Sequence, residues 1–180
     1  MIKIGTRYEL ATILCDRQES LRVPQRMVEV GLGFGDYSAY LLGTYSELKL
    51  TSVESWRGKF MKTRMINARD GVMQRMESYI EDFDYTILEM DSGEGAKHFE
   101  DESLDCVYID AGHDYRNVRA DLGYWYPKVK KGGIFCGHDY KLVGVPGVRT
   151  AVDQFFKVYG LTLGVTEDVN PNASWYTVKP

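Results

Sequence analysis

The stretch Val28-Glu29-Val30-Gly31-Leu32-Gly33-Phe34-Gly35-Asp36-Tyr37-Ser38 decides the fold of the chain. It is a short apolar run that carries one acid, Glu29, and then breaks into alternating glycines before a helix-like segment. Glycine has no Cβ and accepts positive φ, so Gly31 and Gly33 allow a sharp turn and a close approach of the backbone to a ligand. The stretch therefore predicts a buried first strand that leads into a nucleotide-binding turn.

The third glycine distinguishes two kinds of nucleotide-binding turn. A dinucleotide fingerprint G-x-G-x-x-G that starts at Gly31 needs glycine at position 36, but that residue is Asp36 and the glycine comes one position earlier, at Gly35. The spacing is E-x-G-x-G-x-G, counted from Glu29. An ordinary glycine-rich turn between a strand and a helix, with no ligand, is the alternative.

Length and composition predict one soluble domain. The chain has 180 residues, of which 44% are hydrophobic and 27% charged, and it lacks an apolar run of the roughly 20 residues that span a membrane. We expect a single domain over residues 1–180 with a short helical extension at about 1–22. Residues 1–9 lack the apolar core of a secretory signal, so we expect a cytoplasmic protein without a membrane partner.

Charge and cysteine content argue against a nucleic-acid binder and against a protein built on disulfides or zinc. A net charge of -4 and a pI near 5.4 argue against a general nucleic-acid binder, because contacts to phosphates need a basic face. The chain has three cysteines, and Cys106 and Cys136 fall in apolar runs. We expect buried reduced thiols there, without a disulfide framework or a zinc site.

The rest of the chain alternates strand-like and helix-like segments. Strands are predicted at 27–30, 48–53, 85–90, 104–110, 134–137, 161–165 and 174–178. Helices are predicted at 6–21, 38–42, within 56–80, and at 94–99, 115–126 and 148–159. A tight turn is predicted at Lys131-Gly132-Gly133, and the last two strands should be antiparallel neighbours because no helix separates them.

Acidic residues follow several of the predicted strands. Glu54 lies 23 positions after Gly31, close to the offset of about 20 at which an acid accepts hydrogen bonds from ribose hydroxyls. A surface acid that caps the next helix is the alternative for Glu54. Asp91 and Ser92 follow the third strand, where Asp91 could also cap the next short helix.

Two polar clusters follow the fourth and fifth predicted strands. They are Asp110-Ala111-Gly112-His113-Asp114-Tyr115 and Gly137-His138-Asp139-Tyr140. Neighbouring carboxylates repel each other unless a cation or hydrogen bonds offset the repulsion, and Mg²⁺ prefers a few carboxylates and several waters. A metal site is therefore predicted, with the alternatives that His113 caps the following helix and that Asp139 bonds local backbone amides.

The motifs together resemble the class I S-adenosylmethionine (SAM) methyltransferases, and more closely methyltransferase family 24, akin to the macrocin O-methyltransferases. The resemblance covers residues of about 27 to 160. It rests on the glycine turn, the two polar clusters, Asp121-Leu122, Lys131-Gly132-Gly133 and Pro146-Gly147-Val148-Arg149-Thr150-Ala151-Val152. It implies an α/β Rossmann-like fold whose seven-stranded sheet is mostly parallel, with an antiparallel last strand and the order 3-2-1-4-5-7-6.

The resemblance also implies the site residues. Glu29 would lie near the methionine end of SAM, Glu54 at the ribose and Asp91 at the adenine. The full set of expected cofactor-binding residues is Glu29, Gly31, Gly33, Gly35, Glu54, Asp91, Ser92 and Asp110.

The same resemblance implies a metal-assisted site for proton removal. By the family pattern Asp110, His138 and Asp139 would hold a divalent cation and His113 would be the catalytic base. His138 departs from the acidic pair of the family, so Mn²⁺ becomes a candidate beside Mg²⁺.

The expected function is SAM-dependent methylation of a hydroxyl on a small molecule or sugar. A SAM-binding protein without catalysis is one alternative, for which His138 at a metal position is the only hint. A nicotinamide-dependent reductase is the other, and Asp36 disfavours it. The sequence leaves the acceptor and the oligomeric state open, with a homodimer among the options.

Overall fold

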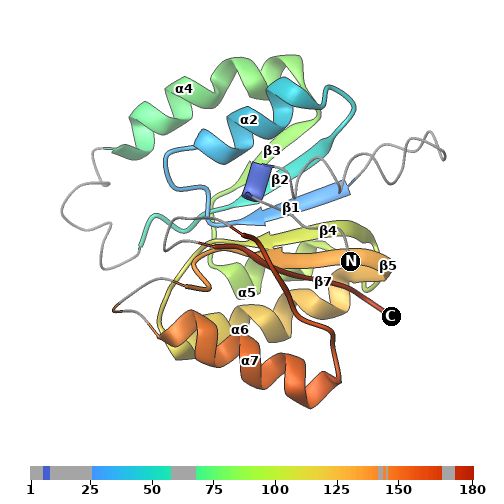
Figure 1. Cartoon of the computed structure of the whole chain (residues 1–180). Helices are drawn as coiled ribbons and strands as arrows, with labels where there is room; N and C mark the ends of the chain where they lie inside the picture. The colour runs from blue at the N-terminus through green and yellow to red at the C-terminus, as the bar shows by residue number, and fades with distance from the viewer. Residues whose placement is uncertain (1–5, 9–25, 58–67, 142–143, 145, 168–172) are drawn as a thin grey trace.

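The computed structural model describes residues 6–8, 26–57, 68–141, 144, 146–167 and 173–180. Its seven-stranded sheet has the order β3-β2-β1-β4-β5-β7-β6, which confirms the predicted order. Helices α2 and α4 lie on one face of the sheet, and α5, α6 and α7 lie on the other (Figure 1). The molecule is therefore a three-layer α/β sandwich.

The strands and helices follow the predicted alternation closely. The strands are β1 (Arg26–Val30), β2 (Lys49–Val53), β3 (Tyr85–Leu88), β4 (Leu104–Ile109), β5 (Val129–Gly137), β6 (Gly164–Val165) and β7 (Trp175–Val178). The α-helices are α2 (Asp36–Thr44), α4 (Ala68–Asp82), α5 (Ser92–Gly95), α6 (Tyr115–Trp125) and α7 (Gly147–Tyr159). Single 3₁₀ turns follow α5 at Ala96–His98 and α6 at Tyr126–Lys128.

The central strands are largely apolar because both faces of the sheet are covered. All six residues of β4 are buried. Side chains alternate between the two faces: Cys106 and Tyr108 pack in the core that contains α2 and α4, while Val107 and Ile109 pack in the core that contains α6 and α7. Cys106 and Cys136 are buried free thiols, which confirms the prediction for them.

The strand directions also agree with those predicted from the sequence. The strands β3, β2, β1, β4 and β5 pair in parallel, and β7 pairs antiparallel with both β5 and β6. The carboxyl ends of the parallel strands therefore meet at one edge of the sheet, where ligands of open α/β sheets bind.

The predicted turn at Lys131-Gly132-Gly133 is wrong. The strand β5 begins at Val129 and runs through these residues, with a shift of register between Leu104 and Cys106 of β4. Gly132 has φ +76, and its amide donates to the carbonyl of Lys179 at 2.8 Å. The two glycines therefore accommodate an irregularity within a strand, a role that glycine also fills in β-bulges.

Parts of two sequence predictions fall outside the described residues. These are the N-terminal extension apart from residues 6–8, and residues 58–67 of the segment in which a helix is predicted within 56–80. None of the described helices combines the length and the apolar character needed to cross a membrane.

A cavity of about 490 Å³ opens at the opposite edge of the sheet from the carboxyl ends. Its lining includes Arg26 and Lys49, the first residues of β1 and β2, and Asp84, which precedes β3. None of the predicted site residues lines this cavity.

Candidate active site

Backbone hydrogen bonds carry the sheet one residue beyond the ends of four strands. The amide of Asp110 donates to the last carbonyl of β1 at 2.8 Å, and that of His138 donates to the last carbonyl of β4 at 3.0 Å. The amides of Gly31 and Glu54 donate to the last carbonyls of β2 and β3 at 2.9 and 3.0 Å. Four predicted site residues are therefore fixed side by side along one edge of the sheet.

Two glycines of the turn differ in their surroundings: Gly31 is closely packed, whereas Gly33 is open among the described residues. Gly31 has φ +98, and a Cβ there would lie 2.2 Å from the carbonyl oxygen of Asp110, so only glycine lets the ends of β1 and β4 come this close. Gly33 has φ +56, and a Cβ there would meet none of the described residues within 4 Å. Gly35 has φ +78 and is the N-cap of α2. The described part of the chain thus leaves space beside Gly33.

Glu54 closes the glycine turn. Its Oε2 accepts hydrogen bonds from the amides of Leu32 at 3.2 Å and Gly33 at 3.3 Å, and its Oε1 accepts from the amide of Trp56 at 2.9 Å. An ionised carboxylate offers about four acceptor positions. These bonds hold Glu54 beside the turn and leave acceptor capacity for a ligand hydroxyl.

Glu29 lies beneath the turn, with only 2% of its surface exposed. Its Oε2 accepts from the hydroxyl of Ser52 at 2.8 Å and from the hydroxyl of Ser38. Burial raises the pKa of Glu29 to about 8, although both hydroxyl bonds act in the opposite direction. The side chain therefore links β1, β2 and α2 inside the core, and its contact with a cofactor stays a prediction.

The buried Glu29 carboxyl should make stability fall as the pH rises. Between its ordinary pKa of 4.5 and about 8, the unfolded chain loses this proton first and the free energy of unfolding decreases. Glu29→Gln should reduce the decrease between pH 5 and pH 8 by about 1.4 kcal/mol or more, the equivalent of one pKa unit. Urea unfolding across this range measures it, with exposed Glu77→Gln as the control, and identical slopes for Glu29→Gln and the wild type would contradict it.

Asp91 and Ser92 follow β3, which ends at Leu88, two residues earlier than predicted. Asp91 is the N-cap residue of α5 but makes no capping bond with its side chain, and its Oδ2 lies 3.5 Å from Nη1 of Arg57. The hydroxyl of Ser92 accepts from Nε1 of Trp125 at 2.8 Å and also bonds Asp121, whose pKa burial raises to about 6. These bonds tie the turn after β3 to α6, and contact with adenine stays a prediction.

Asp139 connects two histidines at the neighbouring strand ends. Its Oδ2 accepts from Nε2 of His113 at 2.9 Å, and its Oδ1 accepts from Nδ1 of His138 at 3.1 Å. Burial alone would raise the pKa of Asp139, but the two imidazole bonds outweigh it and hold the pKa below its ordinary value. The bond to Asp139 in turn raises the pKa of His113. Asp139 therefore orients both rings.

The loop that carries His113 is held by the start of α7. A Cβ on Gly147 would lie 2.4 Å from the carbonyl oxygen of His113, so glycine is needed for this close packing. Asp114, not His113, caps α6, because its Oδ1 accepts from the amides of Arg116 at 3.1 Å and Asn117 at 3.2 Å. The alternative that His113 is a helix cap is therefore wrong.

Asp110 lies between His138 and Arg7. Its Oδ1 is 3.8 Å from Nδ1 of His138, and its Oδ2 is 3.7 Å from Nη1 of Arg7. Burial raises the pKa of Asp110, and the nearby His138 and Arg7 oppose that rise. The carboxyl is therefore in an environment where a further positive charge would stabilise its ionised form.

Three of the described residues can share a metal ion. Asp110, His113 and Asp139 each offer one ligand atom, and these atoms lie within 4.8 Å of one another. Both predicted acids are in this group, but the structure joins His113 to them where the sequence predicted His138. Two carboxylates and an imidazole suit Mn²⁺ as well as Mg²⁺, so the donor set fits a divalent cation.

Sequence reasoning missed four contributors to the site. Asp114 had a local signal, an acid directly before a predicted helix. Ser38 and Ser52 had none, because hydroxyls are common and their bonds to Glu29 depend on the packing of α2 against the sheet. Arg7 had none either, since 103 positions separate it from Asp110.

Comparisons with known proteins agree with this arrangement. The family model of the methyltransferase domain, family 24, matches residues 28–140, which is more than half of the chain. No curated protein matches the sequence closely enough to count as a relative.

Solved structures share the fold. The O-methyltransferase NovP superposes with a TM-score of 0.69 at 18% identity, covering 96% of this chain and 79% of its own. The calicheamicin methyltransferase CalS11 gives 0.67 at 18% identity, with 95% and 77% covered. Spermidine synthase from Thermotoga maritima gives 0.59 at 14% identity, with 96% and 60% covered, so the likeness in fold does not by itself specify the reaction.

The match of the family model spans the glycine turn, Glu54 and the polar clusters after β4 and β5. The chain therefore belongs to methyltransferase family 24, a family of class I SAM-dependent methyltransferases.

Proposed function

We propose that this chain is a SAM-dependent O-methyltransferase that acts on a hydroxyl of a small molecule or sugar with the help of a divalent cation. The observation that carries the proposal is the cluster of Asp110, His113 and Asp139, built at strand ends next to the glycine turn. NovP is described as an O-methyltransferase and CalS11 as a TDP-rhamnose 3'-O-methyltransferase, which supports a hydroxyl acceptor.

SAM would lie across the glycine turn. The space that the described residues leave beside Gly33 would admit a ligand, and the Glu54 carboxylate next to it could accept hydrogen bonds from ribose hydroxyls. Asp91 and Ser92 at the end of β3 would border the adenine. When bound, SAM supplies an activated methyl group on a sulfonium, so the protein has to position the acceptor oxygen, remove its proton and exclude water.

Loss of the Glu54 carboxylate should weaken cofactor binding. Glu54→Ala removes a charge-assisted hydrogen bond to the ribose, which is worth about 1.5 to 3 kcal/mol. Calorimetric titration with S-adenosylhomocysteine measures the change. The same substitution at exposed Glu77 on α4 is the control, and unchanged affinity of folded Glu54→Ala would rule out the ribose role.

The polar cluster would remove the acceptor proton. Asp110 and Asp139 would hold a divalent cation, which supplies positive charge that acidifies a hydroxyl. His113 accepts the proton, and Asp139 holds its imidazole through the 2.9 Å bond to Nε2. His138 keeps Asp139 in place from the other side, at 3.1 Å.

Turnover tests the proposal directly. The purified protein is incubated with SAM, Mg²⁺ or Mn²⁺ and panels of sugars and phenols, and S-adenosylhomocysteine is quantified. Acceptor-dependent formation of S-adenosylhomocysteine supports methyl transfer. Tight binding of SAM without turnover on any acceptor would favour the non-catalytic alternative, and nicotinamide oxidation or reduction would favour the reductase.

A further inference from the structure

Arg7 reaches the candidate active site from the far N-terminal end of the chain. Its Nη1 lies 3.7 Å from Oδ2 of Asp110, and its side chain is 24% exposed. The opposite oxygen of Asp110 faces His138. Arg7 therefore lies beside the cluster of Asp110, His113 and Asp139 and still contacts solvent.

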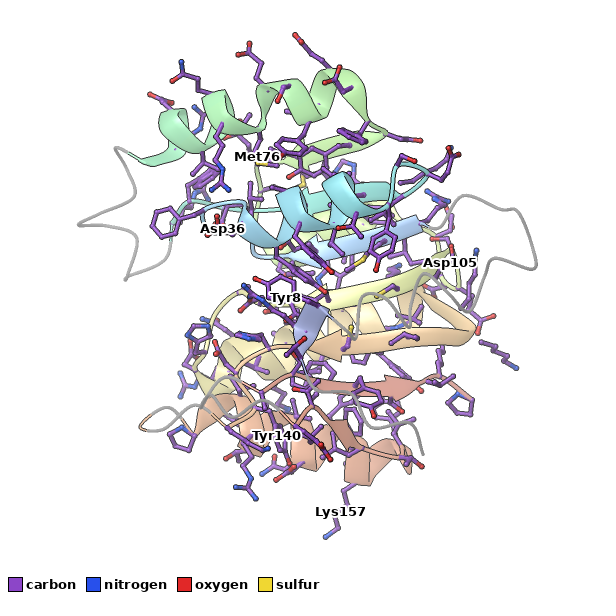
Figure 2. All side chains as sticks on the ribbon, turned by 45° about the horizontal axis from the view of Figure 1, so that its top comes forward. Tyr8, Asp36, Met76, Asp105, Tyr140 and Lys157 are labelled. Carbon is purple, nitrogen blue, oxygen red and sulfur yellow. The ribbon has the colours of Figure 1, made fainter. Side chains whose placement is uncertain are left out.

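Aromatic rings fix the guanidinium group of Arg7. Its central carbon lies 5.1 Å from the ring centre of Tyr8 and 5.2 Å from that of Tyr37. The hydroxyl of Tyr37 donates to the carbonyl of Arg7 at 3.3 Å, and Tyr37 is buried at the start of α2, directly after the glycine turn. Tyr8 packs on Tyr40 of α2, with ring centres 4.5 Å apart, and Figure 2 shows it near the middle of the molecule. The charge is thus held in place beside α2.

The charge balance of the cluster makes an anion the favoured ligand beside Arg7. Asp110 and Asp139 carry two negative charges, which a divalent cation would neutralise when the histidines are neutral. The permanent charge of Arg7 then remains as an excess of one positive charge in a partly buried site. Guanidinium groups bind carboxylates and phosphates through paired hydrogen bonds.

We propose that Arg7 selects the acceptor, and that the acceptor carries a carboxylate or phosphate group in addition to the hydroxyl that is methylated. This inference rests on the proposed function and names its substrate class. A guanidinium that only anchored the N-terminal segment on Tyr37 would affect stability, but it would not distinguish charged from neutral acceptors.

Two matched pairs of probes test the proposal. Protein saturated with S-adenosylhomocysteine and Mn²⁺ is titrated calorimetrically with 3,4-dihydroxybenzoate and 3,4-dihydroxybenzamide, and separately with glucose 6-phosphate and glucose. The first pair shares both hydroxyls and differs by a carboxylate. In the second pair the phosphate replaces the 6-hydroxyl of glucose and the other hydroxyls are shared. In at least one pair the wild type should bind the anion about 10- to 100-fold more tightly, the equivalent of one charge-assisted hydrogen bond. The pair that responds identifies the group as a carboxylate or a phosphate.

Variants assign the preference to Arg7. Arg7→Gln should abolish it, and Arg7→Lys should restore part of it. The control is Arg149→Gln, because Arg149 also lies over a tyrosine ring, 5.7 Å from the centre of Tyr140, and 3.7 Å from a carboxylate, that of Asp153. It should keep the wild-type preference.

Three results would overturn the proposal. They are the absence of any anion preference in both pairs, a preference that survives in Arg7→Gln, and an equal loss in Arg149→Gln. Binding of S-adenosylhomocysteine is measured first in every variant. A wild type that fails to bind it contradicts the proposed function, whereas one that binds it without an anion preference contradicts only the role of Arg7.

Discussion

Replacement of His113 by glutamine should lower kcat by a factor of about 10² to 10⁴, the usual contribution of a general base. Glutamine keeps a polar side chain of similar reach, but it cannot accept a proton at neutral pH. The bond from Nε2 to Asp139 at 2.9 Å holds the ring in place. The affinity for S-adenosylhomocysteine should change little, because His113 is not among the predicted cofactor-binding residues.

A metal-binding measurement separates the two roles open to His113. It lies close enough to Asp110 and Asp139 to ligate an ion with them, so Mn²⁺ affinity is measured by calorimetry in the same variant. If His113 is only a base, glutamine can still donate a hydrogen bond to Asp139 and the Mn²⁺ affinity should stay close to that of the wild type, whereas loss of a ligand should lower it strongly. His98→Gln, an exposed change, is the control. Near wild-type kcat in His113→Gln would exclude the base role and make His138 the next candidate.

Removal of divalent cations should abolish turnover. Treatment with a chelator should reduce the rate at least about 100-fold, because Asp110 and Asp139 would then repel each other and the acceptor hydroxyl would lose its acidifying charge. Added Mg²⁺ or Mn²⁺ should restore the rate. Binding of S-adenosylhomocysteine should persist throughout, since its predicted contacts do not need the metal.

The chelation experiment has a clear contrary outcome. If chelator-treated protein keeps full activity, the two acids act only as hydrogen-bonding groups. The bonds from His113 and His138 to Asp139 would then be the whole of the catalytic arrangement. Asp110→Asn and Asp139→Asn, assayed for Mn²⁺ binding, show which carboxylate the cation needs.

Local patterns were sufficient to predict most of the fold. The run from Val28 to Ser38 predicted a strand, a turn and a helix because it combines an apolar strand with glycines where positive φ is required. The turn predicted at Lys131–Gly133 was wrong because two adjacent glycines also suit an irregular strand. Only the pairing with β4, whose residues lie 25 to 28 positions earlier in the sequence, distinguishes a turn from an irregular strand.

The positions of the candidate site residues that directly follow a strand were predictable from the sequence. Asp110 and His138 follow strands that pair in parallel, so their proximity follows from the topology. The choice between the two histidines was not predictable, because it depends on how α7 packs against the loop of His113. Arg7 was not predictable for the same kind of reason, since its position depends on contacts with α2 that no local pattern encodes.

A crystal structure of the protein with S-adenosylhomocysteine shows directly whether the cofactor meets the proposed catalytic cluster. The ligand should lie across Gly31 and Gly33, with its ribose hydroxyls within hydrogen-bond distance of Glu54 and its sulfur facing the cluster of Asp110, His113 and Asp139. A ligand bound elsewhere, or one whose sulfur points away from that cluster, would contradict the proposed function.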